Sequence, residues 1–244
     1  MVRVLLTRPE EEAERDKKLF HQKGFEVETL PLIGFEEIPF DPPRLNDYDY
    51  LYFGSKRGVR YFLQKVGKIP PHLKVIAVGG KTAESLRNFG VEPHLVLSGS
   101  SKHLLELAKN GKLPKGKILV PTAEVYTKTV YRLKDFGFEV DILPVYRTVF
   151  RKYPIEVVEE KVGRSDILIF ASPSAFKALL ENLQNRAEIL KKKIIVPIGE
   201  TTAAAVRERG FEVSFIPSKP DMAVLVEELA EALNEVLEGK NLKR

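Results

Sequence analysis

Hydroxyl side chains recur where short apolar segments give way to segments with helical spacing. Ser and Thr are ordinary helix caps, and Thr7 with Glu10 has the spacing of a capping box. Taken together, such hydroxyls and the free N–H groups of helix N-termini suit the carboxylates of an anionic ligand. Both interpretations stay open for any single residue. Examples are Thr7-Arg8-Pro9, Ser55-Lys56-Arg57, Gly80-Lys81-Thr82, Ser172-Pro173-Ser174 and Glu200-Thr201-Thr202.

Motifs for other chemistry are incomplete. Gly80-Lys81-Thr82 matches the end of a Walker A loop, but Val75 stands where its first glycine is required. Gly79-Gly80 lacks the third glycine of a dinucleotide fingerprint. Cysteine is absent, and the four histidines show no metal-ligand spacing. We therefore expect no metal site and no thiol nucleophile, and neither nucleotide motif is complete.

Length and composition bound the class of protein. At 244 residues and 43% hydrophobic content, the chain can form one large or two small globular domains. The net charge of +5 suits a small anion, and its spread along the chain argues against nucleic acid. The longest run without a charged residue is Ile167–Phe176, too short to span a bilayer. With no signal-peptide pattern, we expect a cytoplasmic protein without membrane contact.

Apolar segments alternate with helical segments along the whole chain. Because these segments are apolar on both faces, they predict parallel sheets covered by helices on both sides. A final helix is expected over Met222–Leu237. The strand candidates are Val2–Leu6, Tyr50–Phe53, Val75–Val78, Leu95–Leu97, Ile118–Val120, Ile167–Phe170, Ile194–Ile198 and Val213–Ile216.

The sequence also contains an internal repeat, which implies two similar domains. The strands that begin at Gly24 and Gly137 continue past Pro31 and Pro144, so they are long enough to leave one domain and enter the other. The matching segments are Gly24–Pro31 with Gly137–Pro144, Tyr50–Ser55 with Ile167–Ser172, and Val78–Ala83 with Ile198–Ala203.

One position differs in a chemically meaningful way between the copies. Tyr146 stands where the first copy has Ile33. It is either a half-buried strand aromatic or a functional phenol. A phenol can donate a proton or a hydrogen bond to an oxygen leaving group, although its ordinary pKa near 10 suits a reaction that needs modest help.

Six segments in this order resemble the uroporphyrinogen-III synthase family. No single segment is specific, but together with the repeat they extend from Val4 to about Leu237. They are Val4–Pro9, Phe53–Ser55, Val78–Ala83, Pro144–Thr148, Phe170–Ala175 and Ile198–Ala203.

The resemblance implies a fold of two flavodoxin-like three-layer α/β domains with parallel sheets, joined by a two-stranded β-ladder. One domain would combine residues 1–37 with 149–244, the other would comprise 38–148, and the active site would lie in the cleft between them. The family closes the linear tetrapyrrole hydroxymethylbilane into uroporphyrinogen III, with loss of water and inversion of the last pyrrole ring. It is a cofactor-independent lyase of tetrapyrrole biosynthesis.

The resemblance also implies roles for individual residues. Tyr146 matches the linker tyrosine proposed to assist departure of the hydroxyl group. A polycarboxylate substrate would be held by Ser, Thr and basic side chains, and the protein would be a monomer with at most a transient contact to the preceding enzyme of the pathway. Gly54 departs from the family, in which threonine is common at this position. The expected binding residues are Thr7, Arg8, Ser55, Lys56, Arg57, Thr82, Ser172, Thr201 and Thr202.

Two other classes of protein remain as alternatives. A non-catalytic two-domain protein that binds a small molecule would share the cleft. A nucleotide-dependent enzyme of Rossmann type would share the alternation of strands and helices, and stabilisation by NAD or ATP would indicate it.

Overall fold

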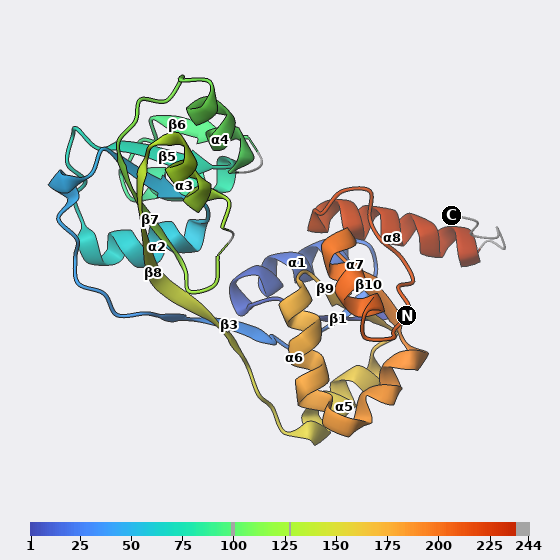
Figure 1. Cartoon of the computed structure of the whole chain (residues 1–244). Helices are drawn as coiled ribbons and strands as arrows, with labels where there is room; N and C mark the ends of the chain where they lie inside the picture. Colours follow the sequence, from blue (N-terminus) through green and yellow to red (C-terminus); the bar gives the residue numbers. More distant parts are fainter. Residues whose placement is uncertain (99–100, 127, 238–244) are drawn as a thin grey trace. The chain divides into compact units, whose positions relative to one another are not determined.

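The computed structural model describes residues 1–98, 101–126 and 128–237 and divides into two compact units (Figure 1). Unit 1 comprises Met1–Gly34 and Val149–Arg244, and unit 2 comprises Phe35–Thr148. The first boundary therefore follows Gly34 instead of residue 37, because strand β3 (Ile33–Glu37) runs through it. In the described ranges, no helix is long and apolar enough to cross a membrane.

Unit 1 contains a four-stranded parallel sheet in the order β10-β9-β1-β2. All residues of β9 are buried, as expected of a central strand covered on both faces. In the register of this sheet, Leu6 of β1 lies opposite Thr29 of β2 on one side and Ile169 of β9 on the other. The strands are β1 (Arg3–Leu6), β2 (Glu26–Thr29), β9 (Ile167–Phe170) and β10 (Ile194–Pro197).

Helices cover the sheet of unit 1. Val4 and Leu6 of β1 pack in one cluster with Phe20 of α1 and Leu225 of α8. Leu5 points the opposite way because side chains alternate along a strand. The helices are α1 (Glu10–Gln22), α5 (Ile155–Arg164), α6 (Pro173–Leu183), η3 (Gln184–Lys192), α7 (Glu200–Arg207) and α8 (Met222–Leu237). The predicted last helix is confirmed, although the side chains of its final residues, 235–237, lie outside the described part.

Unit 2 contains the second sheet, in the order β3-β8-β7-β4-β5-β6. The five strands from β8 to β6 in this order are parallel to one another. The strands are β4 (Tyr50–Phe53), β5 (Lys74–Val78), β6 (Leu95–Leu97), β7 (Lys117–Ala123) and β8 (Glu139–Phe150).

Alternation along β4 separates two clusters in unit 2. Leu51 and Phe53 pack with Phe62 of α2, whereas Tyr50 and Tyr52 pack with Leu104 of α4. The sheet is thus the middle of three layers. The helical elements are η1 (Leu45–Asp47), α2 (Lys56–Val66), α3 (Gly80–Asn88), α4 (Lys102–Lys109) and η2 (Val130–Phe136).

The two units are assembled from exchanged halves of the repeat. Unit 1 uses β1 and β2 of the first copy with β9 and β10 of the second, and unit 2 uses β4 to β6 of the first with β7 and β8 of the second. The equivalent strands nevertheless have the same spatial order in both sheets. They also have the same register, since Arg3 lies opposite Glu26 and Lys117 opposite Glu139.

The predicted β-ladder consists of β3 and β8. The backbone N–H of Ile38 donates to the carbonyl of Val145 (3.0 Å), and that of Arg151 donates to Leu32 (2.9 Å). The later residue of β3 pairs with the earlier residue of β8, so the two strands are antiparallel. The first copy reaches the ladder through a break after Thr29, whereas β8 is continuous over Glu139–Phe150.

The predicted strand Val213–Ile216 is wrong. Ser214 N donates to the carbonyl of Ile195 (3.0 Å), which repeats the bond from His94 to Val75 in unit 2, but no further ladder forms. Pro217 stands where Leu97 ends β6 in the other copy, and proline has no N–H to donate.

Candidate functional site

In unit 2, three predicted site residues lie at the carboxyl ends of the strands. Ser55 follows β4, Thr82 lies in the first turn of α3 after β5, and Tyr146 lies in the second half of β8. Since these strands are parallel, the three residues share one edge of the sheet. Ligands bind at this edge in open α/β sheets.

Ser55 is the N-cap of α2. Its Oγ accepts a hydrogen bond from the backbone N–H of Gly58 (3.1 Å). A side chain at Gly58 would place a Cβ 2.9 Å from the carbonyl oxygen of Pro121 in β7. Glycine at this position therefore lets the first turn of α2 lie directly against β7.

Tyr146 is held by contacts on its ring and on its hydroxyl. Only 8% of the residue is exposed. Its Oη lies 3.2 Å from Ser55 Oγ. Its ring stacks on Tyr61 of α2, with centroids 5.4 Å apart, and meets the edge of Phe35 of β3 at 5.9 Å. The phenol is therefore fixed in orientation as well as position.

An irregularity in the β7–β8 ladder directs the Tyr146 side chain. Thr122 lies opposite Pro144, but the next residue, Ala123, lies opposite Tyr146, so Val145 is an extra residue. Successive side chains of a regular strand point to opposite faces, whereas Val145 and Tyr146 both pack in one cluster. This bulge turns the phenol towards α2 and Ser55.

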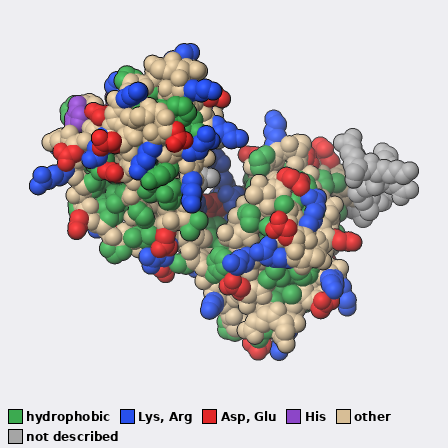
Figure 2. Space-filling view, viewed as in Figure 1, with side chains coloured by type: hydrophobic (Ala, Val, Ile, Leu, Met, Phe, Trp, Pro, Cys, Tyr) green, Lys and Arg blue, Asp and Glu red, His purple; other side chains and the backbone are tan. Residues whose placement is uncertain are grey.

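The first turn of α2 carries Lys56 and Arg57 and no acidic residue. The guanidinium carbon of Arg57 lies 3.8 Å from the centroid of the Phe35 ring, which in turn contacts Tyr146. Positive charge at a helix N-terminus opposes the helix dipole, so this turn favours an anion. Both basic and acidic side chains lie on the face of the molecule shown in Figure 2.

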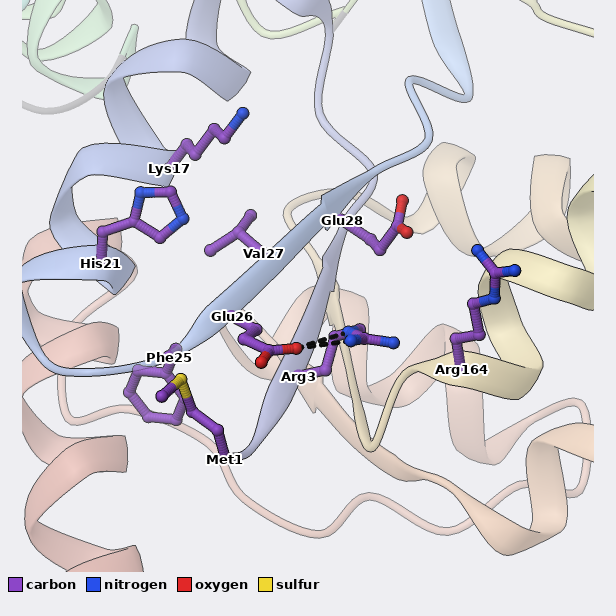
Figure 3. Close-up of a pocket in the computed structure, with 9 residues that line it drawn as sticks. All are labelled: Met1, Arg3, Lys17, His21, Phe25, Glu26, Val27, Glu28 and Arg164. Carbon is purple, nitrogen blue, oxygen red and sulfur yellow. Dashed lines mark hydrogen bonds and ion pairs between the residues drawn. The ribbon is translucent and has the colours of Figure 1, made fainter.

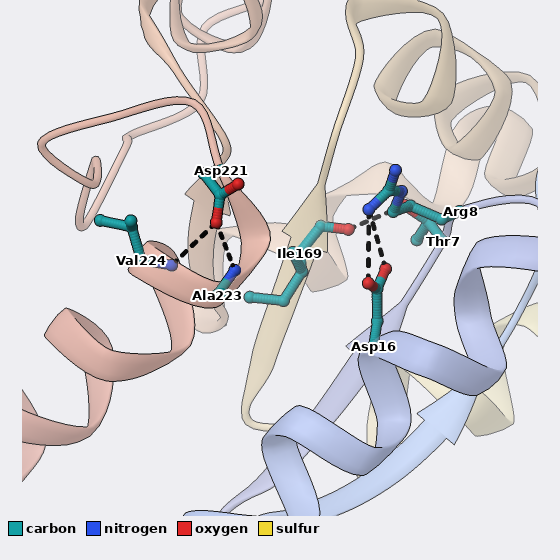
Figure 4. A network of polar contacts seen from close by, with 7 residues as sticks. All are labelled: Thr7, Arg8, Asp16, Ile169, Asp221, Ala223 and Val224. Carbon is teal, nitrogen blue, oxygen red and sulfur yellow. Dashed lines mark hydrogen bonds and ion pairs between the residues drawn. The ribbon is translucent and has the colours of Figure 1, made fainter. Parts of the chain in front are cut away.

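In unit 1, Thr7 and Arg8 follow β1 (Figure 4). The Thr7 hydroxyl donates to the carbonyl of Ile169 (2.7 Å) and is buried. Pro9, and not Thr7, is the N-cap of α1, and no side chain caps this helix, so the predicted capping box is wrong. The bond to Ile169 explains this, because it directs the Thr7 hydroxyl to the neighbouring strand.

Arg8 forms an ion pair with Asp16 of α1. Its Nη1 lies 3.1 Å from Oδ2 and 3.4 Å from Oδ1 of a carboxylate that is fully buried. Burial raises the pKa of Asp16 above its ordinary value of 3.8, and the nearby Arg8 charge opposes this rise. Arg8 is thereby held at the carboxyl end of β1 with its other guanidinium nitrogens directed away from Asp16 (Figure 4).

The remaining predicted residues of unit 1 lie after β9 and β10. Ser172 is the N-cap of α6 and accepts from the N–H of Ala175 (3.1 Å), as Ser55 does in α2. Thr201 and Thr202 lie in the first turn of α7; Thr201 is exposed and Thr202 is buried. These residues share the carboxyl edge of their sheet with Thr7.

A pocket of about 720 Å³ in unit 1 contains none of the predicted site residues (Figure 3). It lies beside β2 and at the amino end of β1, between Lys17 and His21 of α1 and Arg164 of α5. Arg3 and Glu26 within it form an ion pair. This is the end of the sheet opposite to the predicted site. In the described residues, no three His, Asp or Glu side chains are grouped to hold a metal ion.

Tyr61 was not among the residues predicted from the sequence. A signal was available, because the α2 segment aligns with the α6 segment in the repeat and places Tyr61 opposite Ala178. Tyr146 and Tyr61 are thus two tyrosines without counterparts in the other copy, and they stack on each other.

The architecture is that of a two-unit α/β protein with parallel sheets, whose strand ends carry hydroxyl and basic side chains. A family model described as "Uroporphyrinogen-III synthase HemD" matches residues 14–227. The chain belongs to the uroporphyrinogen-III synthase family. It is an enzyme of porphyrin biosynthesis, and neither the nucleotide-dependent nor the non-catalytic alternative is favoured.

Individual relatives agree with this assignment. The chain is 27% identical over 225 residues to a putative uroporphyrinogen-III synthase of Methanocaldococcus jannaschii, with 86% of this chain and 91% of the relative covered. It is 30% identical over 227 residues to the chloroplastic uroporphyrinogen-III synthase of Oryza sativa, with 84% and 72% covered.

Solved structures show the same fold. The uroporphyrinogen-III synthetase of Helicobacter pylori superposes with a TM-score of 0.69 at 21% identity, over 96% of this chain and 100% of the other. A mutant uroporphyrinogen III synthase of Thermus thermophilus gives 0.62 at 23% identity, with the same coverage. The predicted fold class is confirmed by these similarities.

Proposed function

We propose that this enzyme closes hydroxymethylbilane into uroporphyrinogen III, with loss of water and inversion of the last pyrrole ring. It acts as a lyase without a cofactor. The observation that carries the proposal is the Tyr146–Ser55 pair, with 3.2 Å between the two hydroxyl oxygens at the carboxyl edge of the unit 2 sheet.

Tyr146 is the catalytic residue of this proposal. Its phenol donates a proton or a hydrogen bond to the hydroxyl group that leaves the substrate as water. The pyrrole nitrogen assists this departure, so a weak acid suffices. The enzyme's larger task is to hold a flexible linear substrate with its ends in the geometry for ring closure.

The other predicted residues bind the carboxylates of the substrate. Lys56 and Arg57 supply positive charge beside Tyr146, and their place in the first turn of α2 favours an anion there. Thr82, Ser172, Thr201 and Thr202 supply hydroxyl and N–H donors at helix N-termini. Arg8 completes the set at the end of β1, where the buried Thr7 hydroxyl is already bonded to Ile169.

The proposal is tested with freshly prepared hydroxymethylbilane and separation of the products. Spontaneous closure produces the type I isomer, so type III product above that background supports the assignment. Type I product alone contradicts it.

We further propose that the enzyme is a cytoplasmic monomer that binds neither nucleic acid nor membranes. It meets the preceding enzyme of the pathway only transiently. Light scattering at several protein concentrations tests this, since a mass that rises above the chain mass of 27.6 kDa contradicts a monomer.

A further inference from the structure

We propose that Ser55 is a positioning residue whose hydroxyl donates a hydrogen bond to the phenol oxygen of Tyr146 during turnover. This inference rests on the proposed function and gives Ser55 a role different from holding a substrate carboxylate. Ser55 would direct the phenol proton to the leaving hydroxyl and would stabilise the phenolate that remains.

The bonds around Ser55 Oγ limit what its proton can do. The oxygen accepts the N–H of Gly58 at 3.1 Å, so one lone pair is occupied by the helix cap. Tyr146 Oη lies at 3.2 Å, and either hydroxyl can be the donor. If Ser55 donates, the phenol proton is available to another oxygen; if Tyr146 donates, it is not.

The ring contacts allow this exchange without movement of the tyrosine. Tyr61 stacks on the Tyr146 ring with 16° between the planes, and Phe35 contacts it nearly edge-on at 72°. The bulge at Val145 fixes the strand from which the ring projects. Only the two hydroxyl protons then need to rotate when substrate binds.

The proton and electron balance of the step is simple. Tyr146 donates its proton to the leaving oxygen, the C–O bond breaks with its electron pair, and water departs. The phenolate accepts the hydrogen bond from Ser55. The proton that the substrate carbon loses when the ring is formed returns to the phenolate and restores the phenol.

The repeat supplies a matched control for this role. Ser172 caps α6 with the same 3.1 Å bond that Ser55 makes in α2. In unit 1, the position equivalent to Tyr146 is Ile33, which has no hydroxyl. A role in capping alone predicts similar behaviour of the two serines, whereas a role through Tyr146 predicts a difference in kcat.

The experiment measures kcat and KM for type III product in six variants. We expect Ser55→Ala to lower kcat several-fold, to the level of Tyr146→Phe, and the double variant to show no further loss. Ser55→Asp keeps an acceptor for the Gly58 N–H but cannot donate, so kcat should remain low. Ser55→Thr keeps both functions and should recover kcat. Ser172→Ala should raise KM and leave kcat unchanged. The melting temperatures of Ser172→Ala and Ser55→Ala are compared to measure the loss of each helix cap.

Three results would overturn the role of Ser55: full kcat in Ser55→Asp, multiplication of the two single effects in the double variant, or an equal loss of kcat in Ser172→Ala. Ser55→Asp retains a cap, so a low kcat with an unchanged melting temperature is not an effect of unfolding. These outcomes are distinct from failure of the proposed function, in which the unmodified enzyme makes no type III product.

Discussion

The two units share serine caps and buried threonines at equivalent positions, but they differ in the side chain that lies beside the cap of α2 in unit 2 and of α6 in unit 1. Ser55 and Ser172 make the same bond to the third residue of α2 and α6, and Thr82 and Thr202 are buried at the third residue of α3 and α7. Next to Ser55, however, unit 2 has the phenol of Tyr146. The equivalent residue of unit 1 is the buried Ile33.

The difference extends to the surroundings of the phenol. Tyr61 and Arg57 of α2 correspond to Ala178 and Ser174 of α6. The caps and buried threonines at the shared positions support the common fold in both units. The positions that differ cluster around one hydroxyl pair, which favours unit 2 as the source of the proton donor.

The largest effect is expected at Asn182 of α6. Its amide donates to the carbonyl of Arg151 (2.9 Å) and accepts the N–H of Tyr153 (2.9 Å), so it fixes the chain after β8. Asn182→Ala should destabilise the protein by about 3 kcal/mol, because it leaves two backbone groups without partners.

The control is Lys65, the equivalent residue of α2. Its Nζ lies 4.7 Å from the centroid of Phe40, which follows β3. Lys65→Ala should cost less than about 1 kcal/mol, since this contact is at the surface. Equal losses in urea denaturation would contradict the comparison.

The next effect concerns Gly58 and its counterpart Ala175. A glycine-to-alanine change in a helix usually stabilises, but here the new Cβ would meet the Pro121 carbonyl at 2.9 Å. Gly58→Ala should therefore destabilise by about 2 kcal/mol and lower activity through displacement of Ser55. Ala175→Gly should lose only about 1 kcal/mol, the intrinsic helix propensity. Calorimetry and the cyclisation assay test this pair, and a more stable Gly58→Ala would contradict it.

A smaller effect is expected from removal of the phenol hydroxyl. Tyr146→Phe should lower turnover several-fold, roughly 1 kcal/mol in activation free energy, with the fold unchanged. The ring contacts with Tyr61 and Phe35 are kept. Tyr131→Phe, at a 43% exposed tyrosine of unit 2, is the control. Unchanged kcat in Tyr146→Phe would refute the proton-donor role.

The smallest expected effect is a dependence of the unfolding free energy on pH that arises from Asp16 in unit 1. Burial raises the pKa of Asp16 above 3.8, so the folded state holds this proton more tightly than the unfolded state. The contribution of Asp16 to stability is therefore greatest below pH 3.8 and declines as the pH rises through the raised pKa.

Replacement of the carboxyl should remove this decline. Asp16→Asn should flatten the curve of unfolding free energy against pH above 3.8. Asp135→Asn, at an exposed residue of unit 2, should leave its shape unchanged. An identical curve for Asp16→Asn and the unmodified protein would show that the raised pKa has no effect on stability.

Much of the fold was predictable because its signals are local. Strands such as Tyr50–Phe53 and Ile167–Phe170 have the predicted bounds, since a buried parallel strand reads as a short apolar run between turn residues. Val213–Ile216 has the same pattern but forms no strand. Ladder formation depends on the neighbouring chain and on Pro217, which the apolar pattern does not include.

The site was predictable only in part. Tyr146 stood out because the repeat offers Ile33 for comparison, and Ser55 and Ser172 were recognisable as helix caps. Arg8 was expected to be available to carboxylates, yet one of its nitrogens binds Asp16. The place of Asp16 in α1 brings its carboxylate near Arg8, but only the tertiary structure shows that this carboxylate is buried.

The sequence by itself determined the α/β class, the repeat, the caps at Ser55 and Ser172 and the unmatched phenol of Tyr146, because each depends on residue type and spacing. Tertiary structure alone decided that Val145 forms a bulge. It also brought Tyr146 to Ser55 and Tyr61, which are far from it in the sequence. Such contacts depend on strand register and helix packing, which arise only when distant segments bury their apolar faces together.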